Sequence, residues 1–491
     1  MDQILDYIRT PLGVVLLATL GLAYAFHVRF SAAAELPNLP WVGKEDGSLF
    51  AEAIASVRSF GNVRTWLAEG YAKYHKSGKS YILPDFSGNS VVVMPRDQIK
   101  WLLELDGKDI SAHEMHKESL ETKWNFTDAY VVDVPFHEDV LRKALVRRIP
   151  SLIPEVQDEL EKALDDEIGL SEEWHDICVF ELMQKVVARA SNRMFVGVPL
   201  CRNEDYLENA QKFAGDLIRT MGILSFVPKS LKPLIAPLVV RPNHRHFEAC
   251  AKHSVPVIKE RLALHKRQAK EASLEWKPPN DYFTWHIEHA YTTDNFRELD
   301  PVLIARRLMA LNFASIHTTT FTITNTIFDI LGGPGATEVM LGLEKEARQV
   351  LTEEQGIWSK SSLARLLRAD SAVKESLRIS GFLTTGMTRL VTAPHGIINA
   401  AGGWSLPKGS YLGTDVYSMH RDPEIYEQPE TYDAFRFSRP REAFEAKEKG
   451  SQREGGQMTQ AERDEVLRLK GTGLVTTSTE FLAFGHGKHA W

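Results

Sequence analysis

The sequence predicts a mainly α-helical protein with a small β-rich part. An apolar stretch from Asp300 to Leu331 is long enough for one uninterrupted helix. Apolar residues also recur at helical spacing in much of the chain after Val140. The strands are predicted by short runs of β-branched residues near position 80 and again after position 385, bounded by Gly, Asn or Ser.

The composition excludes some functional classes. The 58 Lys and Arg residues stand against 65 Asp and Glu, so the net charge is -7 and no electrostatic footprint for nucleic acid exists. Cys178, Cys201 and Cys250 are too widely separated for a metal-binding spacing or a disulfide framework. So few cysteines suit a reducing, cytosol-facing compartment.

An apolar run from Pro11 to Phe26 predicts a membrane anchor. A spanning helix needs about 20 residues, and Arg9 and Arg29 can extend this run by reaching toward the headgroups. A cleaved signal peptide is the alternative, because Ala32-Ala33-Ala34 could form a cleavage site. The acidic residues before the run favour a retained anchor.

We therefore divide the chain into three parts. Residues 1–30 form the anchor, residues 31–45 a proline-containing hinge, and residues 46–491 one folded domain. In that domain the expected strands are Tyr81–Leu83, Ser90–Met94, Gly386–Val391 and Gly409–Met419.

Helices account for most of the remaining domain. Val140–Arg148 has a basic face, Pro154–Ile168 is acidic, and Phe180–Val196 and Leu363–Ile379 are amphipathic. We expect Pro228–Pro242 to be a loop between helices, with contact to a membrane or a substrate entrance as the alternative. The charged stretch from Glu442 to Lys470 indicates an exposed insertion.

The stretch from residue 300 to 331 gives the longest helical signal. Asp300 suits the N-cap, Pro301 suits the first helical position, and Gly332-Gly333-Pro334 stops the helix. About 30 residues span roughly 45 Å. Its middle is polar, and Thr318-Thr319-Thr320 favours hydroxyls that bond back to the preceding turn.

Two further patterns point to a functional site. Glu375 and Arg378 share a helix face at i, i+3, which in isolation is typical of a minor surface ion pair. Near the end of the chain, Phe484-Gly485-His486-Gly487 predicts a tight turn in which small residues allow the backbone to approach a large planar group. His489 adds a basic side chain two positions later.

The segment from Phe484 to Ala490 resembles the haem-binding loop of the cytochromes P450, Phe-Gly-x-Gly-x-Arg/His-x-Cys-x-Gly. In that family the Cys is the axial iron ligand. Here Trp491 occupies the position of that Cys, and an indole has a donor N–H but no lone pair for iron. The resemblance covers nearly the whole chain. It implies a cytochrome P450-like fold that is incomplete at the C-terminus.

The resemblance also implies roles for individual residues. Thr318 takes the position of the Thr that orients dioxygen, and His317 stands where an acid is usual. Glu375, Arg378 and Arg436 match the buried Glu-Arg-Arg scaffold. Haem contacts are implied for the following residues: Phe484, Gly485, Gly487, and, toward the propionates, Arg389, His489 and Arg142, with His137 as a further candidate.

The function implied by the resemblance is haem-dependent monooxygenation of a small apolar substrate. Haem b, dioxygen and electrons from NADPH through NADPH-cytochrome P450 reductase are expected, with the domain on the cytosolic side of the endoplasmic reticulum membrane. The motifs resemble those of fungal members, which often act in secondary metabolism. With Trp491 at the ligand position we expect this chain to be inactive, as an incomplete form of an active enzyme. The alternative is a haem-free pseudoenzyme or membrane-tethered binding protein.

Overall fold

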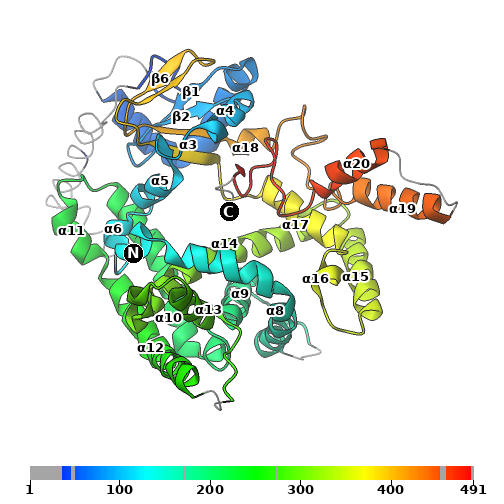
Figure 1. Ribbon diagram of the computed structural model, residues 1–491. Coiled ribbons are helices and arrows are strands. Elements are labelled where there is room, and N and C mark those ends of the chain that lie inside the picture. Colours follow the sequence, from blue (N-terminus) through cyan, green and yellow to red (C-terminus); the bar gives the residue numbers. More distant parts are fainter. Residues whose placement is uncertain are drawn as a thin grey trace.

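The computed structural model describes residue 21 and residues 36–45, 50–169, 173–271, 275–453 and 460–487. Helices dominate these parts, and the strands gather in a small β-rich part at one end of the molecule (Figure 1). The predicted fold class is therefore confirmed.

The helices before the central one are α3 Ala51–Lys73, α4 Ile99–Glu104, α5 Ala112–Ser119, α6 Thr122–Asn125, α7 Tyr130–Asp133, α8 Phe136–Ile168, α9 Val179–Phe195, α10 Glu204–Ser225, α11 Lys232–Val239, α12 Arg241–Lys270 and α13 Tyr282–Thr292. The central helix and those after it are α14 Pro301–Gly332, α15 Ala336–Glu353, α16 Lys360–Leu363, α17 Leu367–Ile379, α18 Val416–Met419, α19 Arg439–Arg453 and α20 Gln460–Lys470.

The main sheet brings together strands from both ends of the domain. Its order is β1-β2-β7-β4-β3, with β1 at Tyr81–Leu83, β2 at Val91–Met94, β3 at Ile110–Ser111, β4 at Thr385–Val391 and β7 at Tyr411–Asp415. Strands β2 and β7 are parallel, and the other neighbours are antiparallel. A separate hairpin joins β5 Ile397–Asn399 to β6 Trp404–Leu406.

The strand expected over Gly409–Met419 is too long. It ends at Asp415, whose side chain accepts a hydrogen bond from the backbone N–H of Ser418 (2.8 Å) and so caps α18. An N-cap of this kind satisfies a donor that a continued strand would have paired, so the chain turns into a helix there.

Helix α14 begins and ends where the sequence predicts. Asp300 accepts from the N–H of Leu303 (2.8 Å), Pro301 occupies the first turn, and the helix runs for 32 residues to Gly332. Its N-terminal half belongs to the largest core cluster, together with residues from α8, α9, α10, α12 and α13. The central helix therefore provides a rigid support through the middle of the helical part.

Two predicted helical stretches prove to be one helix, and one predicted loop is wrong. The stretches Val140–Arg148 and Pro154–Ile168 form one helix, α8, which continues through Pro150 and Pro154 and is 33 residues long. Both prolines are exposed, so water can solvate the carbonyls that lose a donor. The segment Pro228–Pro242 is not a loop, because it contains α11.

The insertion after residue 439 forms α19 and α20, which project from the body of the molecule (Figure 1).

Part of the expected hinge, within residues 36–45, pairs with β1. The backbone N–H of Ile82 donates to the carbonyl of Pro40 (2.8 Å), and the N–H of Val42 donates to the carbonyl of Ile82 (3.1 Å). No helix in the described part of the chain is long and apolar enough to span a bilayer. Apart from Gly21, the expected anchor over residues 1–30 lies outside the described residues.

Candidate functional site

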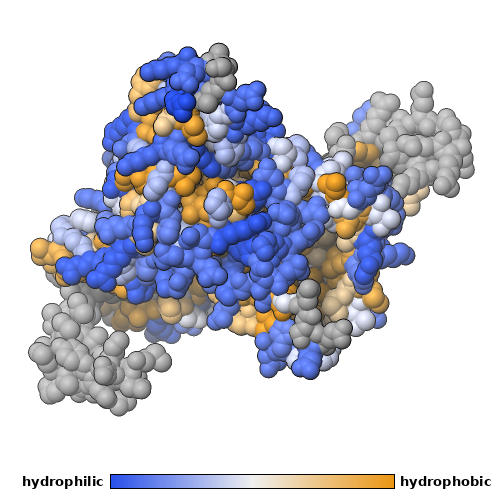
Figure 2. Space-filling view, turned by 90° about the horizontal axis from the view of Figure 1, so that it is seen from below, coloured by the Kyte–Doolittle hydropathy of each residue, from blue (hydrophilic) through white to orange (hydrophobic). Residues whose placement is uncertain are grey.

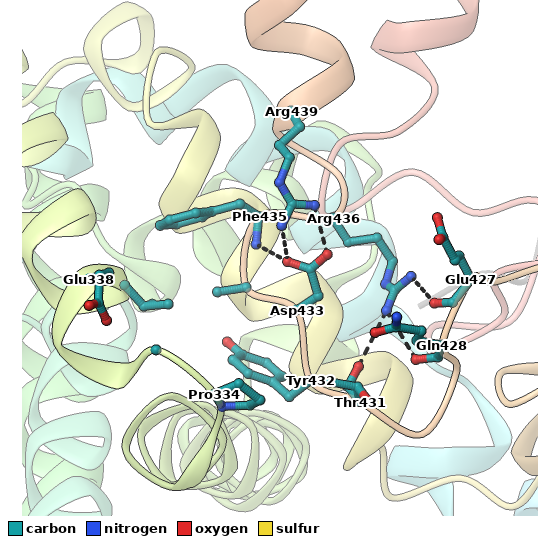
Figure 3. A pocket seen from close by; sticks show the side chains of 13 residues that line it. Pro334, Glu338, Glu427, Gln428, Thr431, Tyr432, Asp433, Phe435, Arg436 and Arg439 are labelled. Carbon is teal, nitrogen blue, oxygen red and sulfur yellow. Dashed lines mark hydrogen bonds and ion pairs between the residues drawn. The ribbon is translucent and has the colours of Figure 1, made fainter.

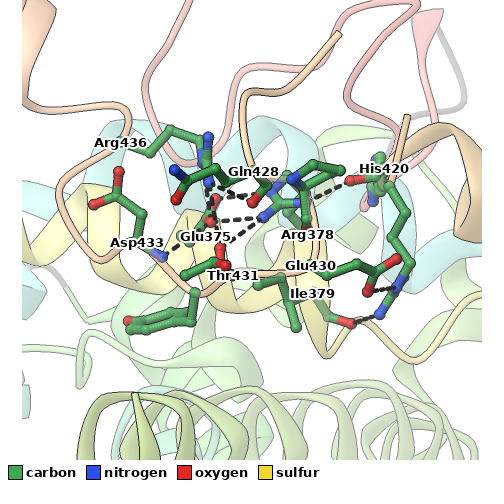
Figure 4. Close-up of polar contacts among 12 residues, drawn as sticks. Glu375, Arg378, Ile379, His420, Gln428, Glu430, Thr431, Asp433 and Arg436 are labelled. Carbon is green, nitrogen blue, oxygen red and sulfur yellow. Dashed lines mark hydrogen bonds and ion pairs between the residues drawn. The ribbon is translucent and has the colours of Figure 1, made fainter. Parts of the chain in front are cut away.

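The structure brings Glu375, Arg378 and Arg436 together (Figure 4). The guanidinium of Arg378 makes two hydrogen bonds to the Glu375 carboxylate, at 2.8 and 2.7 Å, and Arg436 Nε donates to Glu375 Oε1 at 3.0 Å. Glu375 and Arg378 have fully buried side chains. A buried ion pair offsets its desolvation only when the remaining donors and acceptors are satisfied.

The remaining donors of the two arginines bind the segment that follows α18. Arg378 Nη1 donates to the carbonyls of His420 (2.5 Å) and Pro429 (2.7 Å). Arg436 Nη1 donates to the carbonyl of Glu427 (2.6 Å), and the N–H of Asp433 donates to Glu375 (3.2 Å). The triad therefore fixes an irregular segment that has few backbone hydrogen bonds of its own.

A surface pocket lies on the outer side of the triad, between the start of α15 and the segment from Glu427 to Arg439 (Figure 3). Arg436 and Arg439 line it, but both are already paired, Arg436 with Glu375 and Arg439 with Asp433. The pocket therefore offers no free cation to an anionic ligand.

The turn at Phe484 packs against α17 and α4. Phe484 contacts the cluster of Leu377, Phe481 and Ala483, which joins α17 to the C-terminal loop. Gly485 and Gly487 have φ values of 72° and 78°, where glycine is favoured. A Cβ on Gly487 would lie 2.6 Å from Leu103 Cδ2, so the backbone approaches α4 as closely as glycine allows.

Two buried side chains support this loop, and sequence reasoning missed both. His420 Nε2 accepts from the N–H of Leu482 (3.1 Å), and its ring stacks on Phe481 at 5.2 Å. Lys374 Nζ lies 4.3 Å from the centre of the Phe481 ring and donates to the carbonyls of Gly473 (2.9 Å) and Thr476 (3.2 Å). Burial lowers the pKa of His420 to about 3 and that of Lys374 to about 8. Both residue types are common, so only the spatial neighbours identify their role.

Arg389 is a buried cation without a carboxylate. It lies on β4 with 8% of its surface exposed, and its guanidinium donates to the carbonyl of Thr388 (2.9 Å). No ion pair of Arg389 occurs in the described part of the chain, and burial lowers its pKa. The start of β4 also adjoins the C-terminal loop, because a Cβ on Gly386 would lie 4.0 Å from the carbonyl of Leu482.

Thr318 lies in the middle of α14, and its hydroxyl donates to the carbonyl of Ala314 (2.6 Å). Thr322 and Thr326 repeat this pattern one and two turns later. The expected back-bonding of the threonines is therefore present. The hydroxyl oxygen of Thr318 can still accept a hydrogen bond from a ligand or water.

His317 faces α10, where its ring hydrogen-bonds with the backbone of Ala214. Burial lowers its pKa, so the ring is neutral near pH 7. Its Nε2 is buried and has no partner among the described residues, and the same holds for the hydroxyl of Ser315. Buried polar atoms without partners are rare, and they point to a water or ligand at this turn of α14.

Arg142 and His137, which the resemblance implies as propionate contacts, have other partners in the structure. The side chain of Arg142 is 73% exposed and pairs with Asp139 one turn earlier, so the basic face of α8 is solvated. His137 is buried, and its Nδ1 lies 3.3 Å from Nη1 of Arg307. That arginine forms a fully buried pair with Glu298, at 2.6 and 2.7 Å, which sequence reasoning missed because residues nine apart give no helical signal.

Among the described residues, no three His, Cys, Asp or Glu side chains are grouped as a metal site. Cys201 and Cys250 are buried in the helical core, where burial raises the pKa of the Cys201 thiol to about 12, and Cys178 is exposed. His489 and Trp491 lie outside the described residues.

The residues of the site fit the edge of haem that carries the propionate carboxylates. Arg389 supplies an unpaired buried guanidinium that matches a propionate in charge and geometry. The glycine turn of the C-terminal loop leaves room for close backbone approach to a planar group. In Figure 1 the red C-terminal segment lies between the β-rich part and α14.

The comparisons with known proteins agree on one family. The family model "Cytochrome P450" matches residues 62–490. Cytochrome P450 monooxygenase gloP of Glarea lozoyensis is 32% identical over 458 residues, covering 92% of this chain and 81% of the relative. Cytochrome P450 monooxygenase htyF of Aspergillus rugulosus is 31% identical, covering 92% of this chain and 64% of the relative. Cytochrome P450 monooxygenase okaG of Penicillium ochrochloron is 31% identical, covering 98% of this chain and 89% of the relative. This chain thus spans less than two thirds of htyF.

One solved structure is similar in fold. The crystal structure of the cytochrome P450DA heme domain superimposes with a TM-score of 0.61 at 12% sequence identity, covering 92% of this chain and 86% of that one.

Proposed function

Because the chain belongs to the cytochrome P450 family, whose members are haem-dependent oxidoreductases, we propose that it is built to hydroxylate a small apolar substrate in fungal secondary metabolism. The main support for haem binding is Arg389, a buried guanidinium with no carboxylate among its described neighbours. We further propose that this chain lacks monooxygenase activity, because Trp491 occupies the ligand position.

Haem, when bound with a thiolate ligand, supplies the iron chemistry that activates dioxygen. Arg389 would bind a propionate, and Gly485 and Gly487 would let the loop lie against the porphyrin. The Thr318 hydroxyl would orient a water by accepting its hydrogen bond. His317, neutral near pH 7, would accept a proton at Nε2, which has no other partner among the described residues. Glu375, Arg378 and Arg436 would hold the surrounding scaffold.

A membrane location is supported by exposed apolar side chains on α3 and α11. Phe60 of α3 is 80% exposed, and Leu234 and Leu238 of α11 are 74% and 59% exposed. Ring contacts from Phe60 to Phe86 (6.4 Å) and from Phe86 to Phe226 (5.8 Å) connect α3 to the C-cap of α10, which precedes α11 in the chain. We propose attachment to the endoplasmic reticulum membrane, with NADPH-cytochrome P450 reductase as the electron donor.

Reconstitution tests this proposal. The purified chain and a Trp491→Cys variant are each combined with haem, reductase and NADPH, and oxygen-dependent NADPH consumption is measured. We expect consumption above background only for Trp491→Cys, because only that variant has a thiolate at the ligand position. Haem binding by neither protein would favour the haem-free binding protein.

A further inference from the structure

His420 connects the buried triad to the C-terminal loop. It is the C-cap residue of α18, and only 2% of its surface is exposed. Its backbone carbonyl accepts from Arg378 Nη1 at 2.5 Å (Figure 4), and its ring hydrogen-bonds with the backbone of the same arginine. Two contacts therefore tie His420 to the arginine that α17 contributes to the triad.

On its other side, the ring of His420 holds the glycine turn. Its Nε2 accepts from the N–H of Leu482 (3.1 Å), and the carbonyl of Leu482 in turn accepts from the N–H of Gly485 (2.9 Å). Among the hydrogen bonds of the described residues 481–487, the one to His420 is the only one that reaches outside residues 473–487. The turn is therefore joined to the scaffold by one hydrogen bond and by apolar packing.

This hydrogen bond requires a neutral imidazole, because Nε2 accepts the N–H of Leu482 only while it carries no proton itself. Burial and the neighbouring cations lower the pKa of the ring to about 3, so it is neutral near pH 7. Among the described residues, the charged and titratable side chains around the ring are Lys374 and Arg378 of α17, Arg421 and Tyr426. The C-terminal loop faces the ring with Phe481 and Leu482, which do not titrate.

We propose that His420 is a positioning residue, which holds the glycine turn in place against the triad so that the turn can receive the porphyrin. The inference rests on the proposed haem function and adds a residue that acts through Leu482 rather than on haem itself. The stack of the ring on Phe481, with 5.2 Å between ring centres, is a separate contribution, and a phenyl group can replace it. The role specific to histidine is therefore the acceptor at Nε2.

Hydrogen–deuterium exchange of the haem-free full chain tests the positioning role, and a haem titration measures its consequence. His420→Phe keeps the ring stack and removes the acceptor. Residues 481–487 should then exchange about tenfold faster, and haem should bind about tenfold more weakly, which corresponds to the loss of one hydrogen bond. His420→Gln places an amide oxygen near the position of Nε2 and should restore most of both values.

General destabilisation is excluded by a reference segment and by a matched control. Helix α12 lies away from the loop (Figure 1), on the lower side of the molecule, whose surface is mostly hydrophilic (Figure 2), and its exchange should stay unchanged. His75 is also buried, its Nε2 accepts from the N–H of Arg96 (3.0 Å), and its ring stacks on Tyr71 at 4.4 Å. The ion pair of Arg96 with Glu480 is exposed and therefore weak. His75→Phe should speed exchange near Arg96 and leave residues 481–487 and haem affinity as they are.

Equal effects of the two Phe variants on residues 481–487, or unchanged exchange in His420→Phe, would overturn the proposal. Haem binding by none of the proteins, with exchange as expected, would refute the proposed function and still support the positioning role.

The pH profile of haem release distinguishes a titrating ring from a purely structural one. When the loop opens, the ring regains a pKa near 6.5 and binds a proton more readily, so acid favours the open loop. Between pH 7 and pH 5.5, transfer of haem to excess apomyoglobin should accelerate about tenfold more in the unchanged chain than in His420→Gln. Equal acceleration in the two proteins would contradict the proposal.

Discussion

At the scale of single residues, the site is defined by a cation that the protein does not neutralise. Arg421 offers a direct contrast with Arg389. It is also largely buried, but its guanidinium donates to the carbonyls of Ile379 and Tyr417 and lies 3.4 Å from Glu430. An unpaired buried charge destabilises the fold unless a ligand compensates it. We therefore propose Arg389 as a ligand contact that is kept at the expense of stability.

Replacing Arg389 by Met should stabilise the haem-free protein by about 1 kcal/mol, because it removes a desolvated charge that has no carboxylate partner. The same change should weaken haem binding at least about tenfold. Urea unfolding of the haem-free chain and a haem titration measure the two effects. Arg421→Met is the control, and we expect it to destabilise the protein without a comparable effect on haem binding. Destabilisation by Arg389→Met with unchanged haem affinity would show that Arg389 is structural.

At the scale of elements, the triad attaches α17 to the segment that leads to the C-terminal loop. Ser376 of α17 and Ser380 at its C-cap donate to Asp329 of α14, at 2.6 and 2.9 Å, so the same helix is also tied to the central one. These contacts position Thr318, Glu375 and the glycine turn relative to one another.

Substitution of Glu375 by Gln should cost about 3–5 kcal/mol of unfolding free energy, because it leaves Arg378 buried without its counter-charge. Glu465→Gln is a matched control, since Glu465 and Arg468 form an i, i+3 pair of the same type on the exposed helix α20. That change should leave the unfolding free energy almost unchanged, because an exposed ion pair is screened by solvent. Urea denaturation of both variants makes the comparison, and similar costs for the two would contradict the scaffold role.

Local sequence signals were sufficient for some elements and insufficient for others. Asp300 and Gly332 define the ends of α14 because capping is decided by neighbours in the chain. Prolines at 228, 233, 237 and 242 suggested a loop, yet Pro233 and Pro242 occupy the first turns of α11 and α12, where the missing N–H costs nothing. Glu298 and Arg307 required the fold itself, because their pairing depends on how a short 3-10 turn meets α14.

Parts of the site were predictable only through the family pattern. Glu375 and Arg436 are 61 residues apart, and no periodicity connects them. For Arg142 the propionate role stays a prediction, because its side chain is exposed and pairs with Asp139, as on a solvated basic face.

At the scale of the whole molecule, buried histidines determine the response to acid. Burial lowers the pKa of His137, His286 and His420 to about 3 and that of His75 to about 4. Each binds its proton more weakly in the folded state, so stability is fully present above the unfolded pKa of about 6.5 and falls as the pH drops below it. Asp415 opposes this in part, because burial raises its pKa to about 6.

The unfolding free energy should therefore fall by roughly 4–5 kcal/mol between pH 7.5 and pH 5.5, at about 1.4 kcal/mol per histidine less the contribution of Asp415. Urea denaturation across this range measures the slope. His286→Gln should remove the contribution of one buried histidine from this change in unfolding free energy. Replacement of the exposed His244 by Gln is the matched control and should leave the change as it is. A slope that is the same in all three proteins would exclude the buried histidines as its cause.

The most direct test of the account is the absorption spectrum of the reduced, carbon monoxide-bound protein. Our central claim is that the fold encloses haem beside Arg389 while Trp491 leaves the iron without a thiolate. The chain should bind haem and show no thiolate-type band, and Trp491→Cys should gain that band. A thiolate-type band in the unchanged chain, or no haem bound by either protein, would contradict the claim.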